Sequence, residues 1–135
     1  MNKYYHNSHN KFLLRYHLIF VCKYRKNMLS ANNISSDIKN LSIEIATKHN
    51  VNIAYMETDK DHIHYMIETT PNINLSNFVR TLKSYTSFHI WEKYTPYLSK
   101  CIWGKKTFWS DGYFIASIGE VSSSTLKEYI ENQGK

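Results

Sequence analysis

The chain has 135 residues, of which 42% are hydrophobic, and its formal net charge is +6. This length fits one domain with one hydrophobic core, spanning residues 1–135, and nothing in the composition indicates a second domain. The composition excludes a membrane-spanning chain, because no apolar run approaches the length of a bilayer span, and the positive charge favours an anionic partner.

Periodicity predicts the first half of the chain as follows. Residues 1–11 are polar and expected to be flexible, and the β-branched and aromatic residues of 13–24 are typical of a strand. A helix follows over 34–50, since its apolar residues recur at steps of four, three and four. A strand over 51–58 comes next, with Val51, Ile53 and Tyr55 expected on one side.

The second half of the chain is predicted to contain four further regular elements and one irregular region. Residues 62–68 alternate strictly between apolar and polar, as a half-buried strand does. A helix is expected over 75–86, and irregular structure over 95–112, which contains Pro96, Gly104 and Gly112. A strand over 113–118 and a helix over 122–133 complete the chain.

The resulting order is β-α-β-β-α-β followed by an extra C-terminal helix. This order resembles the ferredoxin-like arrangement, so we predict an α+β fold with an antiparallel sheet. Because this fold hosts many functions, it does not by itself assign one.

Basic residues gather in two zones. Residues 1–36 carry Lys and Arg but no carboxylate, and residues 69–110 carry six basic residues against Glu92 alone. Two such zones on one face would bind phosphates, although a solvated basic surface, a ribosomal partner or a membrane surface explains the charge equally well. Tyrosines, 11 in number, can stack on unpaired bases where they are exposed, or can simply occupy strands.

His62 and His64 lie on one face of one predicted strand, about 7 Å apart along it. Their imidazoles can converge on one metal ion, although two ordinary surface histidines would show the same pattern. Tyr129 and Gln133 are four residues apart and share one face of the last predicted helix. Gln133 offers a neutral oxygen ligand, but Tyr129 as packing and Gln133 as a solvated residue are the alternatives.

These elements together resemble the single-tyrosine HUH transposases of the small bacterial insertion-sequence type. The resemblance rests on His62-Ile63-His64, the Lys- and Arg-bearing helix after it, and the run from Tyr129 to Gln133. It extends to Tyr16–Phe20, to Asp61 and to the segment 109–119, and it covers about residues 13–133.

The resemblance implies that His62, His64 and Gln133 bind Mg²⁺ or Mn²⁺ and that Tyr129 is the catalytic nucleophile. It implies a homodimer that acts on single-stranded DNA hairpins at the element ends, with active sites that can be shared between subunits. Gly119 is then the candidate hinge for exchange of the tyrosine helix. The residues expected to contact DNA are Arg80, Lys83, Lys105 and Lys106.

Other residues were given simpler interpretations. His17 lies on an apolar strand and is interpreted as a core histidine, and Tyr113 as packing. Asp61 is either a turn residue or a hydrogen-bond partner of a ligand histidine, and the turn is preferred. Cys22 and Cys101 lack motif spacing, which predicts reduced thiols and a cytoplasmic location.

Three other functions remain open on the sequence. A domesticated relative would act on repetitive extragenic palindromes with the same chemistry. A nucleic-acid-binding module would bind without metal and would be indifferent to Tyr129→Phe. A metal-dependent phosphohydrolase would use water as its nucleophile and form no covalent adduct.

Overall fold

The computed structural model describes residues 14–118 and 123–133, with side chains from residue 127 onward in the second range. The expectations for residues 1–11, Gly119 and Ser122 therefore lie outside the described residues. The elements, in chain order, are β1 (Leu14–Val21), η1 (Lys23–Arg25), η2 (Met28–Ser30), α1 (Ile34–Lys48), β2 (Asn52–Thr58), β3 (His62–Thr69), α2 (Leu75–Cys101), β4 (Phe114–Ser117) and α3 (Ser123–Asn132).

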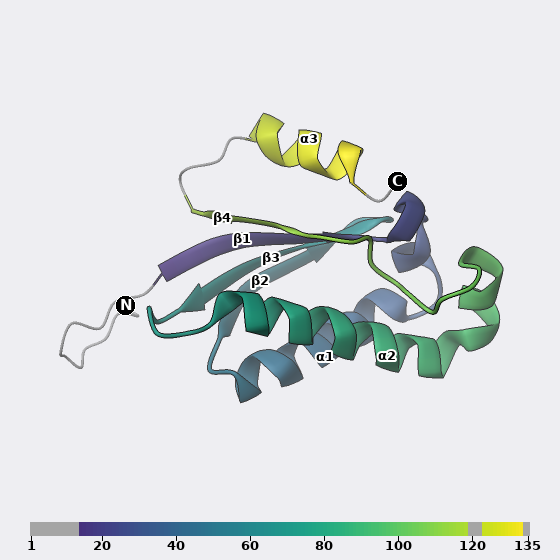
Figure 1. Ribbon diagram of the computed structural model, residues 1–135, viewed down its shortest axis with the longest axis horizontal. Coiled ribbons are helices and arrows are strands. Elements are labelled where there is room, and N and C mark those ends of the chain that lie inside the picture. Colours follow the sequence, from purple (N-terminus) through teal and green to yellow (C-terminus); the bar gives the residue numbers. More distant parts are fainter. Residues whose placement is uncertain (1–13, 119–122, 134–135) are drawn as a thin grey trace.

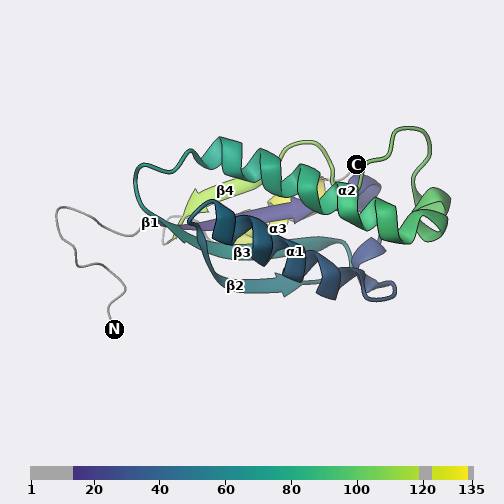
Figure 2. The same cartoon turned by 90° about the horizontal axis from the view of Figure 1, so that it is seen from below.

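The four strands form one antiparallel sheet in the order β2-β3-β1-β4. Helices α1 and α2 lie side by side across one face, and α3 lies over the other (Figures 1 and 2). This is the ferredoxin-like α+β arrangement with a C-terminal helix that the sequence predicts. None of the helices in the described ranges is long and apolar enough to cross a membrane.

The main hydrophobic core lies between the sheet and the α1–α2 layer. Strand alternation directs Leu18 and Phe20 of β1, and Ile63 and Tyr65 of β3, into this core, where all four are fully buried. Their neighbours in the chain, among them His62 and His64, must therefore face α3. Burial of apolar residues on one side thus fixes which residues face the tyrosine helix.

Helix α2 departs from the expectation of irregular structure after residue 95. It continues to Cys101 through Pro96, with a kink at Tyr94, where φ is −118° and ψ is 29°. The kink lets Pro96 occupy the first turn of the following helical stretch, where a missing N–H is tolerated. Burial of Leu98 and Ile102 favours this continuation.

Strands β1 and β2 also differ from the expected pattern. A register shift between Ile53 and Tyr55 places Tyr55 opposite Met66, so the expectation that both share one side was wrong. Strand β1 ends at Val21, earlier than residue 24, because Tyr24 and Arg25 adopt positive φ angles of 58° and 52° that no strand accommodates.

Candidate active site

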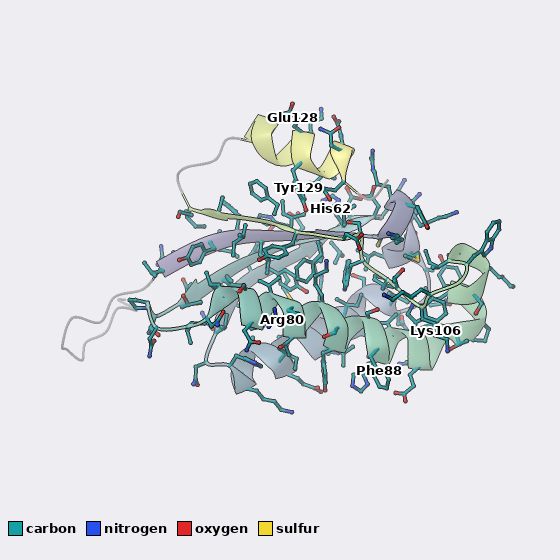
Figure 3. The ribbon with its side chains drawn as sticks, viewed as in Figure 1. His62, Arg80, Phe88, Lys106, Glu128 and Tyr129 are labelled. Carbon is teal, nitrogen blue, oxygen red and sulfur yellow. The ribbon has the colours of Figure 1, made fainter. Side chains whose placement is uncertain are left out.

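The sheet face beneath α3 carries both predicted metal-binding histidines. His64 lies opposite Ile19 and His62 opposite Val21 in the β1–β3 register, on the face away from the main core. Figure 3 shows Tyr129 on the side of α3 that faces this sheet, with Glu128 on the outer side. The fold therefore brings the tyrosine and the histidine strand to the same interlayer space within one chain.

Tyr129 is packed against β4. Its ring centroid lies 5.1 Å from that of Phe114, and its buried Oη atom has no hydrogen-bond partner among the residues that the structure describes. Burial raises the pKa of Tyr129 to about 12. A buried, unpaired hydroxyl is costly in a purely structural tyrosine, so this arrangement calls for a functional explanation.

His62 is held by a chain of polar contacts. Its Nδ1 atom lies 3.0 Å from Oδ1 of Asp61, and Nε of Arg25 donates to Oδ2 of the same carboxylate at 3.2 Å. Since a carboxylate accepts, Nδ1 of His62 carries a proton, so in the neutral imidazole Nε2 is the nitrogen whose lone pair is free for a metal ion. Asp61 is thus the partner of a candidate ligand histidine as well as a turn residue.

His64 pairs with a third histidine. Its Nε2 atom lies 2.9 Å from Nδ1 of His17, and the edge of Tyr55 approaches its ring at a centroid distance of 6.1 Å. Burial, with the neighbouring His17, lowers the pKa of His64 and favours the neutral imidazole that a metal needs. The interpretation of His17 as a core residue was wrong, because it lies diagonally beside His64 on the α3 face. Pattern alone could not reveal this pairing, which depends on the β1–β3 register.

Gln133 directly follows α3. Its backbone N–H donates to the carbonyl of Tyr129 at 3.0 Å, which places Gln133 one helical turn beyond the tyrosine, and its side chain is half-buried. Among the described His, Cys, Asp and Glu residues, no three gather as metal ligands. A site built on His62 and His64 therefore needs a ligand of another type, and Gln133 remains the predicted one.

A hollow opens beside His62 between the sheet and the C-terminal half of α3. Its lining includes Arg25 and Asp61 on one side, and Lys127, Ile130 and Glu131 on the other. One Nη atom of Arg25 donates to the carbonyl of Glu131 at 3.2 Å. This single guanidinium therefore connects η1, the Asp61–His62 pair and the tyrosine helix.

The predicted DNA-contacting residues fall into two groups. Lys83 donates to the carbonyls of Ser110 and Gly112 at 2.9 and 2.8 Å, and burial lowers its pKa. Arg80, which donates to Asn77 within α2, lines a hollow together with Lys83 and Lys106. Lys105 and Lys106 are exposed. Lys83 thus has an internal structural role that its sequence position did not reveal, and DNA contact by all four residues stays a prediction.

The sequence pattern of the family described as "Transposase IS200 like" matches residues 10–133. The chain belongs to this family. IS200-like transposases cut and transfer DNA strands, so the resemblance inferred from His62, His64, Tyr129 and Gln133 is confirmed at the level of the family.

Named relatives agree with this assignment to the IS200-like family. The ISDra2 transposase TnpA of Deinococcus radiodurans is 30% identical over 120 residues, covering 89% of this chain and 84% of that protein. The transposase for insertion sequence element IS200 of Salmonella typhimurium is 25% identical over 126 residues, covering 93% of this chain and 80% of that protein.

Solved structures show the same fold. The crystal structure of a candidate transposase of Deinococcus radiodurans R1 superimposes with a TM-score of 0.81 at 26% identity, covering 98% of this chain and 97% of that one. A REP-associated tyrosine transposase, bound to a REP hairpin, superimposes with a TM-score of 0.57 at 12% identity, covering 97% of this chain and 69% of that one. At that identity the second match supports the fold alone.

Proposed function

We propose that this IS200-like transposase cleaves and rejoins single-stranded DNA through a covalent bond to Tyr129, with Mg²⁺ or Mn²⁺ held by His62, His64 and Gln133. The observation that carries the proposal is the buried hydroxyl of Tyr129, which has no partner within the described part of the chain and lies on the helix that covers the histidine face. A hydroxyl without a protein partner, in a layer lined by imidazoles, suits a group that acts on a bound substrate.

The proposed reaction exchanges one phosphodiester bond for another. The Oη atom of Tyr129 attacks phosphorus, the bond from phosphorus to the 3′ oxygen breaks, and the departing 3′ oxygen takes up a proton. The 5′ end then remains on the protein as a phosphotyrosine. The 3′-hydroxyl of another strand can then attack this phosphotyrosine, which forms a new phosphodiester bond and releases Tyr129. Joining therefore needs no nucleoside triphosphate.

The donor set fits a divalent ion. Because Nδ1 of His62 donates to Asp61, the neutral ring would offer Nε2 to the ion, and burial lowers the pKa of His64, which favours its neutral form. A bound divalent ion would neutralise charge on the phosphodiester and favour loss of the phenolic proton. Such help is required because burial raises the pKa of Tyr129 to about 12, which leaves the phenol protonated near neutral pH.

The proposed substrate is a DNA hairpin with single-stranded flanks at the ends of an insertion sequence. Support comes from the basic zones of this chain, and from its membership of the IS200-like family, whose named relatives include the transposase for insertion sequence element IS200. We further propose a homodimer in which α3 can serve either subunit. Inverted hairpins flanking the gene would favour a mobile element over a domesticated relative that acts on repetitive palindromes.

The decisive experiment incubates the protein with single-stranded DNA from the flanks of its own gene, with Mn²⁺, Mg²⁺ or a chelator. A denaturing gel then separates free DNA from protein-linked DNA, beside the Tyr129→Phe variant. We expect a protein-linked band that needs metal and is absent from Tyr129→Phe. Cleavage without a linked band would indicate water as the nucleophile, and binding without cleavage would indicate a binding module; either result contradicts the proposal.

A further inference from the structure

A second aromatic and basic surface lies at the end of α2, outside the candidate active site. Trp103 is 85% exposed and Tyr24 is 54% exposed, although large aromatic side chains normally bury most of their area. Both rings line one hollow together with Lys26, Lys100 and Cys101. We name these five residues the Trp103 surface.

The backbone on both sides of Trp103 has a defined conformation. Ile102, the preceding residue, is buried, and its N–H donates to the carbonyl of Leu98 at 2.9 Å. Gly104, the following residue, has a positive φ of 76°, which turns the chain directly after the ring. Because the neighbouring backbone is held in this way, a flat ligand can stack on the indole with little loss of conformational entropy.

The described residues that line this hollow carry charge of one sign. They include Lys26 and Lys100 but no carboxylate, and Nζ of Lys23 lies 5.2 Å from the centroid of the Tyr24 ring. Exposed aromatic rings between lysines match the bases and phosphates of an unpaired strand. An apolar protein partner would leave these ammonium groups desolvated without a counter-charge.

The Trp103 surface is continuous with the candidate active site through η1. Tyr24 lines the Trp103 hollow, whereas the next residue, Arg25, lines the hollow beside His62. Figure 1 shows the C-terminal ends of α2 and α3 at the same end of the sheet. A DNA strand that left the His62 hollow across η1 would therefore reach Tyr24 and Trp103.

We infer that the Trp103 surface binds single-stranded DNA outside the cleavage site by stacking unpaired bases on Trp103 and Tyr24. The inference rests on the proposed function, since it extends the path of the DNA strand that is cleaved at the candidate active site. Stacking of this kind tolerates any base, so the surface would hold the strand without reading its sequence.

The test uses the Tyr129→Phe variant without metal and an oligodeoxythymidylate of about ten nucleotides. Trp91 and Trp109 are 5% and 4% exposed, so quenching of tryptophan fluorescence reports on Trp103. Cys101 lines the hollow whereas Cys22 is buried, so alkylation of Cys101 gives a second readout. We expect the strand to quench the fluorescence and to slow the alkylation.

Variants then separate stacking from general charge. Trp103→Ala should weaken strand binding about fivefold or more, and Lys100→Gln should reduce the slope of log K against log salt by about 0.7. Phe88→Ala is the matched control, because Phe88 is a 63% exposed aromatic residue of α2 that is not among the residues lining this hollow. It should bind the strand as the parent protein does.

The inference is overturned if Trp103→Ala binds the strand as tightly as the protein with Trp103, and the strand leaves the Trp103 fluorescence of the latter unchanged. Stronger quenching of Trp103 by an acidic peptide than by the strand would overturn it as well. The assay needs neither metal nor the Tyr129 hydroxyl. A normal Tyr129 adduct with an unresponsive Trp103 therefore refutes this inference alone. A responsive Trp103 without any adduct supports the surface and refutes the proposed chemistry.

Discussion

The guanidinium of Arg25 donates to the backbone carbonyl of Glu131 at 3.2 Å, although the two residues are separated by 106 positions in the chain. The same side chain donates to Asp61, whose other carboxylate oxygen accepts from His62. One residue of η1 therefore fixes the candidate ligand histidine and the tyrosine helix in the same arrangement. Arg25 itself has a φ of 52°, a conformation that the surrounding contacts must maintain.

Arg25→Gln should loosen α3 from the sheet. Loss of the contact with Glu131 removes one hydrogen bond, so amide exchange in α3 should accelerate about fivefold to tenfold. Hydrogen–deuterium exchange measures this directly. Arg80→Gln is the control, since Arg80 bonds to Asn77 within α2. Unchanged exchange in α3 of the Arg25 variant would show that the helix is held by other contacts.

Asp61 should make stability depend on pH in the acid range. Burial opposes its ionisation, but the hydrogen bonds from His62 and Arg25 outweigh it and hold its pKa below the usual value. The ionised carboxylate therefore stabilises the folded chain above about pH 4, and this stabilisation is lost as pH falls through the folded-state pKa. In Asp61→Asn, the free energy of unfolding, measured by urea denaturation, should fall less steeply as the pH is lowered through the acid range. A fall as steep as in the parent would contradict this assignment.

Tyr129→Phe should remove catalysis while making the metal-free protein more stable. The substitution deletes a buried hydroxyl that no described residue hydrogen-bonds, which should raise the free energy of unfolding by about 1 kcal/mol. Tyr65→Phe is the matched control: the Tyr65 hydroxyl bonds to Ser42 at 2.7 Å, and its loss should cost about 1 kcal/mol. Destabilisation by Tyr129→Phe would instead indicate a structural role for the hydroxyl.

His17→Ala should weaken metal binding. Its contact with His64 at 2.9 Å holds the imidazole in one orientation, and loss of such a supporting contact typically costs about tenfold in metal affinity. Titration with Mn²⁺, followed by calorimetry or electron paramagnetic resonance, gives the affinity. Tighter binding in the variant would mean that His17 competes with the ion for Nε2 of His64.

Lys83→Gln and Arg80→Gln should behave differently. Lys83 holds the carbonyls of Ser110 and Gly112, so its replacement should lower the free energy of unfolding by about 1–3 kcal/mol. Arg80→Gln should leave stability nearly unchanged and reduce the salt slope of DNA binding by about 0.7. An equal loss of salt slope in both variants would restore Lys83 as a phosphate contact.

Local periodicity was sufficient for much of the fold, and it placed the candidate site residues on common faces, but only the family resemblance gave them their proposed roles. A period of two places His62 and His64 on one strand face, and a period near four places Tyr129 and Gln133 on one helix face, whatever surrounds them. The same reasoning predicted the order of strands and helices, because that order depends on local patterns of apolar residues.

Tertiary structure alone decided which of these faces meet. The pairing of His17 with His64 follows from the β1–β3 register, and the use of Lys83 as an internal donor follows from the path of residues 110–112. The passage of α2 through Pro96 likewise depends on buried side chains beyond it. Contacts between residues far apart in sequence arise only when the whole chain buries its apolar surface, so no local pattern contains them.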